Sequence, residues 1–155
     1  MKIVVVGHGM VGHKFLESLV ESGLQGADVT VLCEEPRPAY DRVHLSEFFA
    51  GKSAEDLSVV EPGFFERSGF TLRLAARAAH IERRTNTVTT VDGETFTYDK
   101  LVLATGSNPF VPPVPGRDRS HCFVYRTIED LEAMKASGAK SKSGVVVGGG
   151  LLGLE

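Results

Sequence analysis

The chain is poor in the residues that would assign it to a specialised class. It has no tryptophan and only two cysteines, Cys33 and Cys122, among 155 residues. This cysteine usage provides neither a disulfide framework nor an iron–sulfur ligand set, and it is typical of a reducing, cytoplasmic location. The five histidines form no metal-ligand pattern with cysteine or aspartate. We therefore expect no metal site in this stretch.

Charge of one sign and long apolar runs are also missing. The 17 Lys and Arg residues and the 20 Asp and Glu residues are mixed along the chain, for a net charge of −3. No basic stripe suits nucleic acid, and no apolar run is long enough to span a bilayer. The opening apolar run, Ile3 to Val6, is too short for a signal peptide. We expect a soluble globular protein without nucleic-acid or membrane partners.

Two glycine clusters of one design stand out against this background. Both Gly7–Gly12 and Gly148–Gly153 read G-x-G-x-x-G, and each follows a run of valines. Before and after the first cluster, the patterns predict a buried strand at 2–6, a helix at 10–22 and a second buried strand at 29–33. Strand, glycine turn, helix and strand form a βαβ unit, which is typical of dinucleotide-binding folds.

Each glycine of the first cluster has a physical role in such a site. Gly7 permits the tight turn, Gly9 lets the backbone approach a pyrophosphate, and Gly12 allows the helix to pack closely on the strand. Met10 and Val11 begin the helix, whose N–H groups and positive dipole end face the phosphates. A purely structural glycine turn is the alternative.

An acidic residue is expected where the second strand ends, because its carboxylate accepts the ribose hydroxyls. Glu34 and Glu35 both lie there. We favour Glu35, and a solvated carboxylate is the expectation for whichever of the two is not used.

The remaining patterns predict further elements and a fold class. The apolar face of the first helix is expected to comprise Val11, Phe15, Leu16, Leu19 and Val20. Beyond the second strand we expect short helices at 45–50, after a start at Ser53 with Asp56, and after Pro62. Strands are expected at 70–74 and 101–104, with antiparallel strands across 78–98 that turn at Asp92-Gly93. A proline-rich linker at 109–116 would be followed by a helix from Thr127 to about Ala136 and a strand at 145–147. Cys33 and Cys122 are expected to be small buried residues.

These elements predict an α/β fold. A Rossmann-like dinucleotide-binding domain, with a parallel sheet and an antiparallel β-meander, would occupy residues 1–115. The beginning of a second Rossmann domain would occupy 116–155. Because the chain stops as the second glycine site begins, we expect both domains to be incomplete.

The combined motifs resemble a known family. The glycine clusters together with Tyr40-Asp41-Arg42 and Ala104-Thr105-Gly106 resemble the FAD- and NAD(P)H-dependent pyridine nucleotide oxidoreductases. Within that family, residues 33–46 (CEEPRPAYDRVHLS), 123–131 and 147–155 are similar to the N-terminal part of NAD(P)H nitrite reductase large subunits. The resemblance covers essentially the whole chain.

The resemblance implies roles for particular residues. The first glycine cluster would hold FAD, with Arg42 near its pyrophosphate or flavin end; an ion pair with Asp41 is the alternative for Arg42. Ala104, Thr105 and Gly106 would form a second close backbone approach, and the backbone of Ala78 would meet the adenine. Residues expected to begin an NAD(P)H site are Gly148, Gly150, Gly153 and Glu155.

Two departures narrow the chemistry that the family implies. Its disulfide reductases have cysteine beside the flavin shortly after the second strand, and residues 41–49 contain none. A thiolate is the reacting group in disulfide exchange, so we do not expect that chemistry. Ferredoxin and rubredoxin reductases often have lysine after the Leu-Ser of this segment, where this chain has Glu47. This difference favours nitrite reductase.

The leading interpretation is therefore the flavin-binding portion of a nitrite reductase large subunit. FAD would accept hydride from NAD(P)H and pass electrons to iron–sulfur and sirohaem centres outside these residues. No side chain here would need to act as a catalytic acid, base or nucleophile, and the chain alone would not reduce nitrite. A small nitrite reductase subunit or another electron-transfer protein is the expected macromolecular partner. The alternatives are a fragment of an NADH-dependent ferredoxin or rubredoxin reductase and a non-catalytic dinucleotide-binding module.

Overall fold

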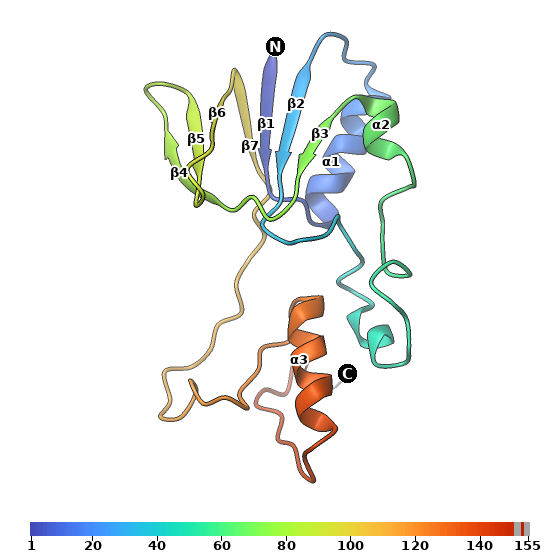
Figure 1. The fold of residues 1–155 in the computed structure, drawn as a ribbon, viewed down its shortest axis with the longest axis vertical. Coiled ribbons are helices and arrows are strands. Elements are labelled where there is room, and N and C mark those ends of the chain that lie inside the picture. Colours follow the sequence, from blue (N-terminus) through green and yellow to red (C-terminus); the bar gives the residue numbers. More distant parts are fainter. Residues whose placement is uncertain (151–152, 154–155) are drawn as a thin grey trace. The chain divides into compact units, whose positions relative to one another are not determined.

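A parallel four-stranded sheet is the centre of the first part of the chain. The computed structural model describes residues 1–150 and 153, and it places the strands in the order β3-β2-β1-β7. All neighbouring pairs are parallel (Figure 1), as the βαβ pattern predicted. The strand bounds are β1 Lys2–Val6, β2 Asp28–Leu32, β3 Thr71–Arg73 and β7 Lys100–Leu103.

An antiparallel three-stranded sheet, in the order β4-β5-β6, lies in the sequence between β3 and β7 of the parallel sheet. Its strands are β4 Ala78–Glu82, β5 Thr87–Thr90 and β6 Thr95–Thr97. The turn between β5 and β6 contains Asp92-Gly93, and Gly93 has a φ of +86°. This confirms the expected meander and its turn, because glycine adopts positive φ without steric cost.

Among the elements that the structure describes, the longer helices are α1 Met10–Glu21 and α3 Ile128–Gly138. The 3-10 helix η1 Leu45–Phe48 and helix α2 Phe64–Ser68 are shorter. Gly23, with a φ of +68°, follows the C-terminal end of α1. Thr127 caps α3 through a reciprocal capping box with Asp130, as the sequence predicted.

The core of the parallel sheet explains why β1 reads as a continuous apolar run. Ile3 and Val5 belong to a buried cluster with Leu16 of α1, whereas Val4 and Val6 belong to a second cluster with Val88 of β5. A strand covered on both faces needs apolar residues at every position. The alternation of β1 between two cores fixes its register in the sheet.

Three expectations about burial are corrected by the structure. Val11 and Val20, expected on the apolar face of α1, are 76% and 46% exposed, because the helix packs through Gly12, His13 and Leu16 instead. Leu103 of β7, expected in a buried strand, is 60% exposed, because β7 is an edge strand in the part of the sheet that the structure describes. Cys122 is exposed, whereas Cys33 is buried as expected.

Two expected elements do not form. Ser53 and Asp56 exchange the hydrogen bonds of a capping box, yet the segment ends after one turn and no helix follows. Residues 145–147 form no strand, and Val145 and Val147 are 89% and 88% exposed. A strand is defined by pairing, and within 1–150 and 153 no strand pairs with this segment.

The chain divides into two compact units. The first comprises residues 1–41 and 58–107, and the second comprises 42–57 and 108–155. The first unit contains both sheets, α1 and α2, and the second contains η1 and α3. Residues 42–57 thus group with the chain beyond 108, a division that differs from the sequence boundary at 115. The nucleotide-binding domains assigned to 1–115 and 116–155 stay predictions.

Candidate functional site

The first glycine turn lies directly after β1 and contains two glycines that packing requires. Gly7 has a φ of +103°, and a Cβ there would overlap the carbonyl of Ala104. A Cβ at Gly12 would overlap the carbonyl of Gly7. Gly9 differs, since its φ is −94° and an added Cβ would have nothing within 4 Å. The turn is therefore tightly packed at Gly7 and Gly12 and bare at Gly9.

The N-terminus of α1 follows Gly9 and is electrostatically uncompensated by side chains. Gly9 is the N-cap residue, no side chain caps the helix, and its first turn contains no acidic residue. Met10 is half-buried and Val11 exposed, so the helix begins at the surface. The N–H groups and the positive end of the helix dipole favour an anion here.

The ends of three parallel strands bring other predicted residues to the same edge of the sheet. The Gly7 N–H donates to Leu32 at the end of β2 (2.9 Å), and the Ala104 N–H donates to Val6 at the end of β1 (2.8 Å). Thr105 and Gly106 follow Ala104 and are exposed, and Gly106 has a φ of +70°. In open α/β sheets, ligands bind outside the carboxyl ends of the strands. The predicted turn residues meet at this edge.

The structure distinguishes the two carboxylates that follow β2. Glu34 is exposed and forms a 3.5 Å ion pair with Arg77. Glu35 is half-buried, and the hydroxyl of the buried Tyr40 donates to its Oε2 at 2.7 Å. The Ala75 N–H donates to the Glu35 carbonyl at 3.0 Å. Glu35 is thus the more firmly oriented carboxylate.

Ala78 begins β4 and is half-buried against the core cluster that contains Val4 and Val88. The hydrogen bond from the Ala75 N–H to the Glu35 carbonyl joins the segment that precedes Ala78 to the segment that contains Glu35. The sequence predictions at Glu35 and Ala78 therefore fall on adjoining segments of the first unit.

Arg42 and the second glycine cluster belong to the second unit. Arg42 Nη1 donates to the Arg126 carbonyl at 2.9 Å. Gly148 has a φ of +127°, and a Cβ at Gly153 would overlap the Gly148 carbonyl, which is the same close approach as that of Gly12 to Gly7. The Gly153 N–H donates to Gly150 at 3.0 Å. Glu155 lies outside the described residues.

Sequence reasoning missed a buried histidine pair beside the first glycine turn. His8 and His13 are 5% and 2% exposed, and their rings contact edge to face with centroids 5.5 Å apart. Burial, and secondarily the charge of His13, lowers the pKa of His8 to about 4. The spacing of His13 from the buried Leu16 was the signal that could have placed His13 on the inner face of α1.

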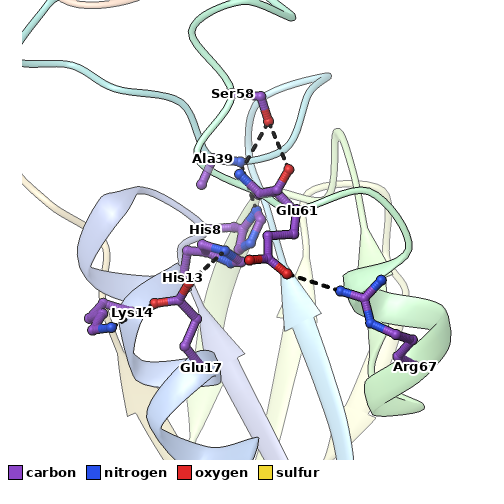
Figure 2. Close-up of polar contacts among 9 residues, drawn as sticks. His8, His13, Lys14, Glu17, Ala39, Ser58, Glu61 and Arg67 are labelled. Carbon is purple, nitrogen blue, oxygen red and sulfur yellow. Dashed lines mark hydrogen bonds and ion pairs between the residues drawn. The ribbon is translucent and has the colours of Figure 1, made fainter.

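Charged side chains surround His13 in Figure 2. Burial lowers the pKa of His13, and the nearby carboxylates of Glu17 and Glu61 oppose that effect. Glu17 Oε1 lies 3.7 Å from His13 Nε2, and the Lys14 ammonium donates to Glu17 Oε2 at 2.9 Å. The hydrogen bond from Lys14 lowers the pKa of the Glu17 carboxyl, so this carboxylate stays ionised at neutral pH.

Among the described residues, no group of three or more His, Cys, Asp or Glu side chains is arranged so that it could hold a metal ion. Within the same residues, no helix has both the length and the apolar character needed to cross a membrane.

The chain matches the pyridine nucleotide-disulphide oxidoreductase family over residues 1–155. It belongs to this family. The match spans both glycine clusters and the segments between them, so membership does not depend on one short motif. The α/β fold and the family expected from the sequence are confirmed.

Curated relatives agree with the resemblance seen in the sequence. The chain is 51% identical, over its whole length, to the NADH nitrite reductase large subunit of Escherichia coli, of which it covers 18%. It is 56% identical, over 99% of its length, to the NAD(P)H nitrite reductase large subunit of Klebsiella oxytoca, of which it covers 16%. The chain therefore corresponds to the N-terminal region of such subunits and spans less than a fifth of their length.

Solved structures share the fold at lower sequence identity. NADH:rubredoxin oxidoreductase from Clostridium acetobutylicum superimposes with a TM-score of 0.82 at 28% identity, covering 98% of this chain and 39% of that one. The water-forming NADH oxidase from Lactobacillus brevis, bound to NADH, gives a TM-score of 0.87 at 25% identity, covering 99% of this chain and 36% of that one.

Proposed function

We propose that this chain is the FAD-binding portion of an NAD(P)H-dependent nitrite reductase large subunit. The observation that supports this most directly is the bare backbone at Gly9, which is followed by a helix N-terminus without a side-chain cap or acidic residue. A diphosphate needs both close backbone approach and positive potential. The identity to nitrite reductase large subunits supports the choice of enzyme.

The residues of the first unit would hold FAD through its adenosine diphosphate. Gly7, Gly9, Gly12 and the first residues of α1, Met10 and Val11, would bind the diphosphate through backbone groups. Glu35 is the better candidate than Glu34 for the ribose hydroxyls, because Tyr40 orients its carboxylate. The other proposed residues of the first unit are Ala78, Ala104, Thr105 and Gly106. Arg42 lies in the second unit and stays a prediction from the resemblance.

The second glycine cluster would begin the NAD(P)H site. Its support is the Gly148–Gly153 close approach, which repeats the geometry of the first turn. Bound FAD would supply hydride acceptance from NAD(P)H and one-electron release. The iron–sulfur and sirohaem centres that complete nitrite reduction are proposed to lie outside these residues, in the cytoplasm, with a small subunit or other electron-transfer protein as partner.

Thiol–disulfide chemistry is not part of the proposal despite the family name. Residues 41–49 contain no cysteine, and Cys33 is buried with its Sγ directed at the Arg37 carbonyl at 3.4 Å. A reacting thiol needs exposure and a stabilised thiolate.

A ferredoxin or rubredoxin reductase fragment is the second candidate. It is favoured by the structural similarity to the Clostridium rubredoxin reductase and by 32% identity to rhodocoxin reductase from Rhodococcus erythropolis. Two observations favour the first candidate. The identity to nitrite reductase large subunits is higher. Position 47 is a glutamate that pairs with Lys52, whereas ferredoxin and rubredoxin reductases often have lysine at this position.

Titration of the purified chain with FAD, followed by quenching of flavin fluorescence, tests the proposal. We expect saturable binding, and Gly9→Val is expected to abolish it, because the side chain would fill the space that the diphosphate needs. The variant should remain folded, since its Cβ meets no protein atom within 4 Å. Gly144→Val, another position where a Cβ meets nothing, is the matched control. Equal FAD affinity in the parent and Gly9→Val would contradict the site.

A further inference from the structure

His8 lies between the first two glycines of the turn, and its side chain is directed inward. It is 5% exposed, whereas the space beside the neighbouring Gly9 is open. The turn therefore has a bare outer side at Gly9 and an inner side that His8 anchors. A side chain at position 8 that pointed into solvent would make no contact between the turn and the interior of the protein.

The anchor is a hydrogen bond to a distant segment. The Ala39 N–H donates to His8 Nδ1 at 3.1 Å, across 31 positions of the sequence (Figure 2). The Ala39 carbonyl in turn accepts from the Val59 N–H at 3.2 Å. Because Nδ1 accepts, the neutral ring has its proton on Nε2. The lowered pKa of His8, about 4, keeps the ring neutral at physiological pH.

Aromatic packing holds the His8 ring in place. The ring contacts Phe65 of α2 at a centroid distance of 5.3 Å and His13 of α1 at 5.5 Å, both edge to face. Phe64 contacts both His13 and Phe65, at 4.9 and 5.3 Å. Contacts from two helices thus fix the direction in which Nδ1 points.

The segment that His8 anchors contains the proposed ribose carboxylate. Ala39 is followed by Tyr40, whose hydroxyl donates to Glu35 Oε2 at 2.7 Å. Ala39 and Tyr40 are both 2% exposed, so their backbone has little freedom to move independently of the core. The contacts run from the glycine turn through His8 to Ala39, and from Tyr40 to Glu35.

We propose that His8 is a positioning residue that holds the segment 35–40, and with it the Glu35 carboxylate, in register with the diphosphate turn. The inference rests on the proposed dinucleotide function. A ligand with diphosphate and ribose needs both groups at a fixed separation, and preorganisation of that separation increases affinity. His8 would contribute to affinity without touching the ligand.

Two substitutions separate the hydrogen bond from the bulk of the side chain. His8→Asn retains an acceptor close to the position of Nδ1, and His8→Leu fills the cavity without one. We expect His8→Leu to weaken the affinity for FAD and for ADP by at least about 10-fold, and His8→Asn to remain within about 3-fold of the parent. Circular dichroism and urea unfolding would verify that each variant is folded. Equal loss in both variants would overturn the proposal.

A double-mutant cycle with Glu35→Gln tests whether His8 acts through that carboxylate. We expect Glu35→Gln to weaken ADP binding in the parent and to have little further effect in the His8→Leu background. Additive effects would show that His8 does not act through Glu35 and would overturn the positioning role.

Hydrogen exchange of the Ala39 amide provides a readout that needs no ligand. The amide is expected to be protected in the parent and in His8→Asn and to exchange faster in His8→Leu. Unchanged exchange would overturn the anchor itself. If the parent bound neither FAD nor ADP, the proposed function would fail together with the ligand-directed part of this inference, while Ala39 exchange would still decide whether His8 fixes the segment.

Discussion

At the scale of residues, the three glycines of the first turn differ in what they require. Gly7 and Gly12 are needed by the fold, because a side chain at either would overlap a backbone carbonyl. Gly9 has an ordinary φ and open space, so no contact within the chain requires glycine there. What sets Gly9 apart from other glycines with open space is that it precedes the uncapped N-terminus of α1, and this position supports the proposed diphosphate site.

Gly7→Ala and Gly9→Ala should therefore differ in stability. We expect Gly7→Ala to lower the free energy of unfolding by about 2 kcal/mol or more, because it combines positive φ with steric overlap. Gly9→Ala is expected to change it by less than about 1 kcal/mol. Urea denaturation followed by circular dichroism measures both, and similar losses in the two variants would contradict the assigned geometry.

His8 gives the stability of the protein a pH dependence. Its pKa falls from 6.5 in the unfolded chain to about 4 in the fold, mainly through burial. Between these two values the unfolded chain binds the proton and the folded chain does not, so stability falls as the pH is lowered from 6.5 to 4. The shift corresponds to a loss of about 3 kcal/mol.

His8→Asn is expected to show a correspondingly flatter pH dependence over that window. Urea unfolding at pH 7, 5.5 and 4 would measure it, with His13 still titrating in both proteins as the shared background. A pH profile identical to that of the parent would show that His8 is not the buried base responsible.

At the scale of elements, burial decides which apolar runs become strands. β1 and residues 145–147 are both valine-rich, yet only β1 has neighbours on two sides and a covered face on each. The capping box at Ser53 likewise forms its hydrogen bonds without nucleating a helix. Local sequence favours a helix or strand, but tertiary contacts are needed to stabilise it.

The contrast between the two valine runs can be measured by matched substitutions. Val145→Thr with Val147→Thr should leave the free energy of unfolding within about 0.5 kcal/mol of the parent, because both side chains are exposed. Val5→Thr places a hydroxyl in a fully buried position and is expected to cost roughly 1–3 kcal/mol. A comparable cost for the double variant would mean that residues 145–147 are paired in solution.

At the scale of the whole molecule, each compact unit contains one glycine turn. The first unit has both cores and the complete βαβ unit, whereas the second has three exposed valines before its glycines. The proposed FAD site is therefore the better formed of the two. We expect the chain to oxidise NADH only slowly.

FAD should consequently stabilise the first unit. A ligand at 100 times its dissociation constant adds about 2.7 kcal/mol to the folded state, enough to raise the unfolding midpoint by several degrees. Riboflavin, which lacks the adenosine diphosphate, is expected to produce no shift. Thermal unfolding with each ligand measures this, and an equal shift with riboflavin would place recognition away from the diphosphate turn.

Much of this protein was determined by local sequence. The first glycine cluster, the bounds of β1 and α1, the Asp92-Gly93 turn and the Thr127 cap all depend on neighbours within a few residues, and steric and hydrogen-bond preferences act at that range. Only the tertiary structure decided that Val11 faces outward, that residues 145–147 pair with no strand among the described residues and that Glu35 is oriented by Tyr40. It also joined His8 to Ala39, because burial and long-range hydrogen bonds depend on segments that meet only when the chain has folded.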